Sequence, residues 1–298
     1  MSGWTGDVIP MKKILITGGD GYFGRRFRQK YAGAFEILST DKGDLDITDR
    51  VKVQEAFRDF KPDIVVHAAA LLVTDFCEKH PEICHDINVQ GAVNVAEACR
   101  SVGARLVFIS TEQVFNGNSE GGPYKESDVP RPNTVYGKNK LDAEKRLLEM
   151  VPALWTLRFG WTFGFPERNL PLSPNLFWDV IRSALRGERM RVAVNEYRSL
   201  TYIYDIIDQF DKVFALPFGL YHVGSRNSMS RYEVACEILR LIGVGHRIDE
   251  LLEKDADRYK DAPRDVRLDT SKIEGCGFAF SETREGLAKL VREFGLGN

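Results

Sequence analysis

The sequence lacks a long apolar segment and an excess of charge of either sign. None of its hydrophobic runs approaches the ~20 residues that span a bilayer, so we expect no membrane partner. A net charge of −2 in 298 residues provides no basic surface for nucleic acid. The hydrophobic content of 43% is typical of an ordinary globular protein. A length of 298 residues is enough for one large α/β domain or two smaller ones.

Cysteine is scarce, and its spacing suggests neither disulfides nor metal. The five cysteines are odd in number and form no Cys-x-x-Cys pair, which favours reduced thiols and a cytoplasmic location. Cys77 and Cys84 lie close in sequence, but no third ligand follows at a plausible spacing, so the sequence predicts no metal site. Residues 1–10 have no apolar core typical of a signal peptide. We expect a disordered leader there, with Met11 as the functional start.

A glycine-rich turn follows the first strand-like run of the chain. Residues 13–17 are short, apolar and β-branched, which is typical of a buried parallel strand. Gly18, Gly21 and Gly24 then follow at intervals of three. Such glycines allow a tight turn, a close approach of the backbone to a phosphate, and close packing of helix on strand. Because free amides and the helix dipole then face an anion, the turn predicts a dinucleotide site.

A carboxylate follows this turn at the distance expected for a ribose-binding acid. Asp41 ends the next apolar run, about 20 residues after the glycines. Its carboxylate accepts a hydrogen bond from a ribose 2′-hydroxyl and repels a 2′-phosphate, which favours NAD. Lys42 is adjacent and would soften that repulsion, so NADP stays open as the cofactor.

The order of patterns along the chain predicts the fold class. Strand-like and helix-like segments alternate up to Gly160, which indicates an α/β fold with a Rossmann-type doubly wound parallel sheet and ligands at the carboxyl ends of its strands. The pattern then breaks, and we expect a smaller, discontinuous C-terminal substrate lobe. We assign residues 11–160 plus 198–224 to the dinucleotide-binding domain and residues 161–197 plus 225–298 to the substrate-binding lobe.

The second motif is a Tyr-x-x-x-Lys pair on a predicted helix over residues 134–150. Tyr136 and Lys140 are four apart, so their side chains share one face. A free tyrosine has a pKa near 10, too high for proton exchange at neutral pH. An ammonium ~4 Å away is worth about 4 kcal/mol at an effective dielectric of ~20, or about three pKa units. We therefore expect Lys140 to lower the pKa of Tyr136 and to bond the nicotinamide ribose.

A third group should polarise the substrate oxygen. Ser110 and Thr111 end the strand that precedes the catalytic helix. Strand alternation directs them to opposite sides, so one of them faces the substrate. The pattern alone does not choose between the two.

These motifs together resemble the extended short-chain dehydrogenase/reductases that act on nucleotide sugars. The resemblance covers nearly all of residues 11–298 and is closest to the dTDP-4-dehydrorhamnose reductase subgroup. Its anchors are residues 17–24, 44–49, 67–69, Asn88, 109–117, 123–126, 136–140, 158–161, 221–224 and 263–269. It implies NAD(P)H-dependent reduction of a 4-keto group on a deoxyhexose nucleotide sugar.

The resemblance assigns roles to individual residues. It implies Thr111 as the hydroxyl of a catalytic triad, Tyr136 as proton donor and Lys140 as its modulator. The candidate cofactor-binding residues are Gly18, Gly21, Tyr22, Phe23, Gly24, Asp41, Lys42, Asp44, Leu45, Ala68, Ala69, Tyr136 and Lys140. The candidate substrate-binding residues are Thr111, Glu112, Trp161 and Arg264.

At one position the sequence differs from the subgroup, and this difference helps to distinguish among related nucleotide-sugar enzymes. Where the subgroup usually has Thr-Asp-Tyr, this chain has Thr111-Glu112-Gln113. The amide of Gln113 cannot shuttle a proton, which disfavours the nucleotide-sugar dehydratases. Two alternatives remain: a nucleotide-sugar epimerase, and a non-catalytic regulatory subunit resembling the methionine adenosyltransferase β subunit. The oligomeric state stays open between monomer and homodimer.

Overall fold

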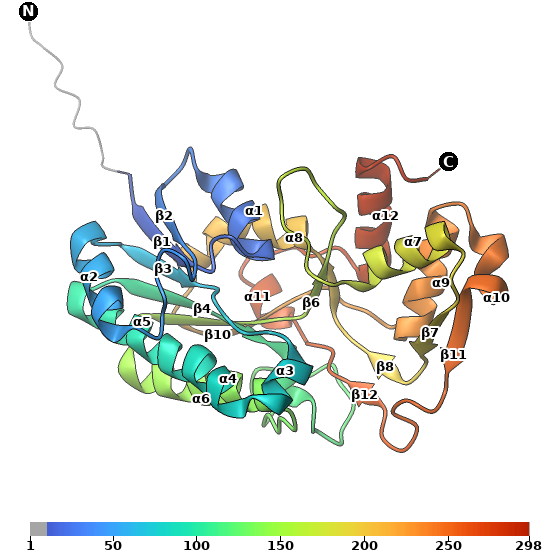
Figure 1. Ribbon diagram of the computed structural model, residues 1–298, viewed down its shortest axis with the longest axis horizontal. Helices are drawn as coiled ribbons and strands as arrows, with labels where there is room; N and C mark the ends of the chain where they lie inside the picture. Colours follow the sequence, from blue (N-terminus) through green and yellow to red (C-terminus); the bar gives the residue numbers. More distant parts are fainter. Residues whose placement is uncertain (1–10, 298) are drawn as a thin grey trace, which may run out of the picture.

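The computed structural model describes residues 11–297, built around a six-stranded parallel sheet (Figure 1). The strand order is β10-β5-β4-β3-β1-β2. These strands are β1 (Lys13–Thr17), β2 (Glu36–Thr40), β3 (Ile64–His67), β4 (Arg105–Thr111), β5 (Leu154–Phe159) and β10 (Gly219–Val223). The order runs outward in both directions from β1 and β3, which confirms the predicted doubly wound sheet. The predicted leader, residues 1–10, lies outside the described residues.

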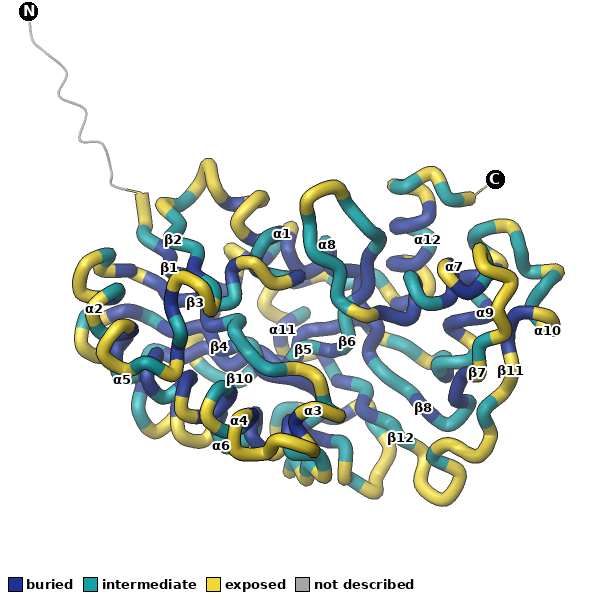
Figure 2. The backbone as a smooth tube through the Cα atoms, viewed as in Figure 1, coloured by how far each residue is buried: buried dark blue, intermediate teal, exposed yellow. Residues whose placement is uncertain are grey.

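Helices cover both faces of this sheet. One face carries α2 (Arg50–Phe60), α5 (Gly91–Val102) and α6 (Val135–Met150), and the other carries α1 (Tyr22–Tyr31), α8 (Ile203–Ile207) and the 3-10 helix η3 (Phe210–Ala215) (Figure 1). Strand alternation divides the core accordingly: Leu15 packs with the first group, while Ile14 and Ile16 pack with the second. Because both faces are covered, the central strands are buried along their length (Figure 2).

Apart from α8, η3 and β10, most segments after Gly160 form a smaller lobe at the carboxyl end of the sheet (Figure 1). Its paired strands are β6 (Trp161–Phe163) with β9 (Leu200–Tyr202), β7 (Met190–Ala193) with β11 (Leu252–Asp255), and β8 (Glu196–Tyr197) with β12 (Arg264–Asp265). Its helices are α7 (Leu176–Arg186), α9 (Arg231–Leu241), α10 (Ile248–Leu251) and α12 (Thr283–Glu293). One apolar core contains both Ile14 of the sheet and Val180 of this lobe, so the two parts share packing. The predicted domain boundaries stay a prediction.

Short helices fill the remaining connections of the fold. They are α3 (Thr74–Lys79), α4 (Pro81–His85), the π-helix η1 (Asp86–Gln90), the 3-10 helices η2 (Glu112–Phe115) and η4 (Gly245–Arg247), and α11 (Ser271–Glu274). The helices α4, η1 and α5 follow one another without an intervening loop. Within residues 11–297, no helix is both long enough and apolar enough to cross a membrane.

Candidate active site

A single large cleft runs along the carboxyl ends of the strands and under the smaller lobe. It encloses about 1960 Å³. Residues from the turn after β1, the ends of β2 to β5, the start of α6 and the strands β6, β8 and β12 contribute to its wall. The cleft therefore joins the predicted dinucleotide site to the predicted substrate lobe.

The glycine-rich turn is shaped as a phosphate cradle. Gly18 has φ +70°, and a Cβ there would lie 2.7 Å from the backbone nitrogen of Ala69. A Cβ on Gly24 would lie 2.3 Å from the carbonyl oxygen of Gly18, so α1 packs against the turn at a distance that only glycine allows. No side chain caps the start of α1. These features fit the pyrophosphate of a dinucleotide, which would take hydrogen bonds from the free amides.

Twelve of the thirteen predicted cofactor-binding residues line the cleft; Asp44 does not. The Asp44 carboxylate lies 3.4 Å from the backbone nitrogen of Asp41, within its own turn, and the residue is solvent-exposed. Asp46, which the sequence analysis did not select, lines the cleft instead. Two hydrogen bonds from Thr48 lower the pKa of Asp46.

Asp41 lies where the sequence places the ribose-binding acid. It is half-buried at the end of β2 and lines the cleft together with Lys42. Its carboxylate accepts hydrogen bonds from the backbone amides of Asp20, at 3.0 Å, and Lys42, at 2.7 Å. These bonds fix the carboxylate between the glycine-rich turn and the end of β2.

The catalytic helix approaches the end of β4 closely. Thr134 caps α6 by accepting a hydrogen bond from the amide of Gly137 at 3.1 Å. A Cβ on Gly137 would lie 2.7 Å from the carbonyl oxygen of Gln113, so glycine allows α6 to pack on the segment after Thr111. Tyr136, at the second position of α6, is buried and lines the cleft.

The structure distinguishes the two hydroxyl candidates. The Ser110 hydroxyl donates to the buried carboxylate of Glu144 at 2.5 Å, so it is already committed to the protein. Thr111 caps η2 by accepting from the amide of Gln113 at 3.2 Å, and its hydroxyl acts to lower the pKa of Tyr136, so the two side chains are neighbours. This geometry favours Thr111 as the hydroxyl that faces a substrate.

The titration of Tyr136 differs from the sequence-based expectation. Burial raises the pKa of Tyr136 above its ordinary value, and the neighbouring Thr111 hydroxyl only partly opposes this effect. Lys140 is also buried; its Nζ donates to the carbonyl oxygen of Ile109 at 2.7 Å. The expected lowering of the Tyr136 pKa is therefore wrong for this structure, because desolvation dominates and the ammonium is engaged elsewhere.

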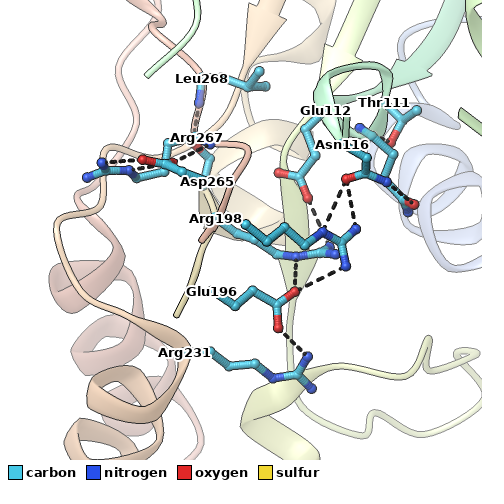
Figure 3. Close-up of polar contacts among 12 residues, drawn as sticks. Thr111, Glu112, Asn116, Glu196, Arg198, Arg231, Asp265, Arg267 and Leu268 are labelled. Carbon is cyan, nitrogen blue, oxygen red and sulfur yellow. Dashed lines mark hydrogen bonds and ion pairs between the residues drawn. The ribbon is translucent and has the colours of Figure 1, made fainter. Parts of the chain in front are cut away.

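The other end of the cleft holds a buried ionic cluster, which Figure 3 shows in part. Glu112 is 2% exposed, and its Oε1 accepts from Nη1 of Arg198 at 3.0 Å. Its Oε2 is buried and has no hydrogen-bond partner within residues 11–297. Burial raises the pKa of Glu112 to about 7, although Arg198 and Arg264 act in the opposite direction. An unpaired buried oxygen at a cleft wall favours a polar ligand.

Glu196 lies at the centre of this cluster. It accepts hydrogen bonds from Arg198, Arg231 and Arg264 at 2.8, 3.1 and 3.4 Å. Burial opposes its ionisation, but the three arginines outweigh that effect and lower the pKa of Glu196 to about 2. The sequence analysis missed Glu196, Arg198 and Arg231, which lie outside any recognisable motif.

The predicted substrate contacts lie beside this cluster. Trp161 lines the cleft, with the guanidinium carbons of Arg198 and Arg231 at 4.7 and 5.0 Å from its ring centroid. Arg264 also lines the cleft and donates to Oδ1 of Asn116 at 2.9 Å. Thr111, Glu112, Trp161 and Arg264 are thus brought to one cavity.

Comparisons with known proteins agree with this geometry. The RmlD substrate binding domain family matches residues 11–296. A spore coat polysaccharide biosynthesis protein of Bacillus subtilis is 30% identical over 95% of this chain and 98% of its own length. The methionine adenosyltransferase 2 subunit β of Bos taurus is 28% identical over 90% of this chain and 84% of its own. A dTDP-4-dehydrorhamnose reductase from Bacillus anthracis, solved with NADP, has a TM-score of 0.83 at 28% identity and covers 95% of this chain and 99% of its own.

Proposed function

This chain belongs to the RmlD substrate binding domain family, and we propose that it is an NAD(P)H-dependent reductase of a 4-keto deoxyhexose nucleotide sugar. The observation that carries the proposal is the convergence of Thr111, Tyr136 and Lys140 on the cleft that the glycine-rich turn also lines. The similar proteins include a dTDP-4-dehydrorhamnose reductase and a polysaccharide biosynthesis protein, which supports a role in carbohydrate biosynthesis.

The protonation of Tyr136 suits a reduction. Its raised pKa keeps the phenol protonated at neutral pH, so it can give a proton to the oxygen formed from a ketone. Thr111 lines the cleft with that phenol and holds the carbonyl oxygen beside it. When bound, NAD(P)H supplies the hydride that adds to the carbonyl carbon.

The arginines of the smaller lobe give the other end of the cleft an affinity for anions. Arg198, Arg231 and Arg264 face two carboxylates, those of Glu112 and Glu196, which leaves one cation in excess when both are ionised. Guanidinium groups bind phosphate oxygens through paired N–H bonds. This end of the cleft therefore suits the nucleotide diphosphate, and the Glu112 oxygen without a partner suits a sugar hydroxyl.

The proposal also covers location and assembly. Four of the five cysteines are buried free thiols, which supports a cytoplasmic location. The chain is proposed to act as a monomer or a homodimer, without nucleic acid or membrane partners.

A second candidate is a non-catalytic regulatory subunit that binds the dinucleotide. The similarity to methionine adenosyltransferase 2 subunit β over 90% of the chain favours it. Such a subunit has no need for a buried, protonated tyrosine beside Thr111, so we rank it second.

The decisive assay is a panel of 4-keto-sugar nucleotides with NADH and NADPH, followed at the absorbance of the reduced nicotinamide. Consumption of cofactor with at least one member supports the reductase. Dinucleotide binding without reduction of any member, together with co-purification of a larger enzyme, would support the regulatory subunit instead.

A further inference from the structure

Three buried polar side chains meet behind the catalytic residues. Ser110 comes from β4, Arg158 from β5 and Glu144 from α6, which pack against one another (Figure 1). Their residues are 3%, 3% and 7% exposed. Neither Glu144 nor Arg158 lines the cleft, so the proposed reaction gives them no direct task.

The contacts within this triad are close and charge-assisted. Glu144 Oε1 accepts from the Ser110 hydroxyl at 2.5 Å and from Arg158 Nε at 3.0 Å. Its Oε2 accepts from Arg158 Nη2 at 2.6 Å. The paired N–H bonds fix the carboxylate in one orientation.

The triad holds both neighbours of Ser110 in the chain. Ile109 precedes Ser110, and its carbonyl oxygen accepts from Lys140 Nζ at 2.7 Å. Thr111 follows Ser110 and lines the cleft with Tyr136, whose pKa its hydroxyl acts to lower. The carboxylate of Glu144 therefore holds the end of β4 in place, next to both Tyr136 and Lys140.

Glu144 also continues the functional face of α6. It follows Lys140 by four residues, as Lys140 follows Tyr136, so all three lie on one face. We propose that Glu144, tied to Ser110 and Arg158, is a positioning residue that fixes the end of β4 and favours the ammonium form of the buried Lys140 side chain.

The electrostatic surroundings of Lys140 support this role. Burial lowers the pKa of Lys140 to about 7, and Glu144 is the largest influence in the opposite direction, followed by Cys84. The other titratable groups that face Lys140 are Tyr136 and His67; burial lowers the pKa of His67 to about 3, so its ring is neutral near pH 7. Glu144 is thus the main source of negative charge for this ammonium.

The inference deepens the proposed function, since it assigns a task to Lys140, but it can be tested without substrate. The test measures the titration of Lys140 by NMR of protein carrying ¹³Cε-lysine, with the signal assigned by its loss in Lys140→Met. The main variant is S110A/E144M/R158M, which removes the whole triad and leaves no buried partner unpaired. Apolar replacement of a whole buried ion pair is often tolerated.

We expect a Lys140 midpoint below that of the wild-type protein, because the variant removes the carboxylate that most favours the ammonium form. As a control, R26M/E167M removes another ion pair, between the buried Arg26 and the partly buried Glu167, and should leave this midpoint unchanged. If S110A/E144M/R158M unfolds, E144Q/R158Q keeps hydrogen-bonding groups without either charge and should give the same downward shift. An unchanged midpoint in a folded variant would overturn the proposal.

Steady-state kinetics of the triad variant test the positioning role separately from the proposed reaction. In the triad variant, kcat should fall more than KM rises, and the alkaline limb of the pH profile should follow the Lys140 midpoint downward. A variant with wild-type kcat and pH profile would contradict the positioning role. If the wild-type protein reduces no keto sugar, the proposed function fails, while the NMR titration still decides the role of Glu144.

Discussion

Glu112 and Arg198 form an ion pair of 3.0 Å that links the end of β4 to the segment between β8 and β9. Both side chains are at least 90% buried, and both residues line the cleft. Figure 3 shows the contact between them. It ties the sheet to the smaller lobe at the point where a sugar would lie beside Thr111. Because burial raises the pKa of Glu112 to about 7, the charge of this pair changes near neutral pH.

The raised pKa of Glu112 predicts a pH-dependent stability. Its pKa is 4.5 ordinarily and about 7 in the folded protein, where burial raises it. Because the folded state holds this proton more tightly, stability falls as pH rises from 4.5 to 7. Glu112→Gln removes the titration, so its unfolding free energy relative to wild type should rise by up to about 3 kcal/mol across this window. Chemical denaturation at pH 4 and pH 8 measures it; a constant difference would contradict the assignment.

Tyr136→Phe should separate binding from chemistry. The variant keeps the ring but loses the proton donor, so turnover should fall by at least ~100-fold, the low end for general acid catalysis. Cofactor affinity should be close to that of the wild type, as measured by fluorescence titration with NADH or NADPH. Turnover at the wild-type level would remove Tyr136 from the mechanism.

Gly24→Ala should damage the dinucleotide site. The new Cβ would lie 2.3 Å from the carbonyl oxygen of Gly18, so α1 or the turn must move, at a cost of about 1–3 kcal/mol. We expect weaker cofactor binding and a lower melting temperature. Gly33→Ala is the matched control, because a Cβ there meets nothing within 4 Å. Equal behaviour of the two variants would show that close packing at Gly24 is unimportant.

Asp41 should set the choice of cofactor. Its carboxylate is fixed by the Asp20 and Lys42 amides at the cleft wall. There it would accept a hydrogen bond from a ribose 2′-hydroxyl and repel a 2′-phosphate. Like-charge contacts can cost several kcal/mol, but the adjacent Lys42 offsets part of this, so NADH should bind at least as well as NADPH with a modest margin. Asp41→Ala should shift the affinity ratio toward NADPH. If the wild-type protein instead binds NADPH tenfold more tightly than NADH, Lys42 binds the ribose 2′-phosphate and Asp41 does not face the ribose.

Local motifs made much of this site predictable. The turn around Gly18 and Gly24 and the pair Tyr136–Lys140 are short-range patterns, and their geometry follows directly from strand–turn–helix and helix periodicity. The resemblance built on them is confirmed by the family match over residues 11–296. The roles of the individual residues stay predictions.

The rest depends on tertiary contacts that the sequence does not encode locally. Glu196 and Arg231 are 35 residues apart, and Glu112 and Arg198 are 86 apart, so no spacing rule connects them. The pKa of Tyr136 was mispredicted for the same reason: burial, which depends on the whole fold, outweighs the effect expected from a neighbouring lysine.

The central claim is hydride delivery to a sugar ketone in this cleft. The most direct measurement supplies NADH or NADPH deuterated at C4 of the nicotinamide, on either face, with a 4-keto deoxyhexose nucleotide, and analyses the product by mass spectrometry and NMR. The account predicts one deuterium at sugar C4 from one of the two labelled faces, and its loss with Tyr136→Phe. Recovery of unreduced sugar with both cofactors and both faces, across the whole substrate panel, would contradict it.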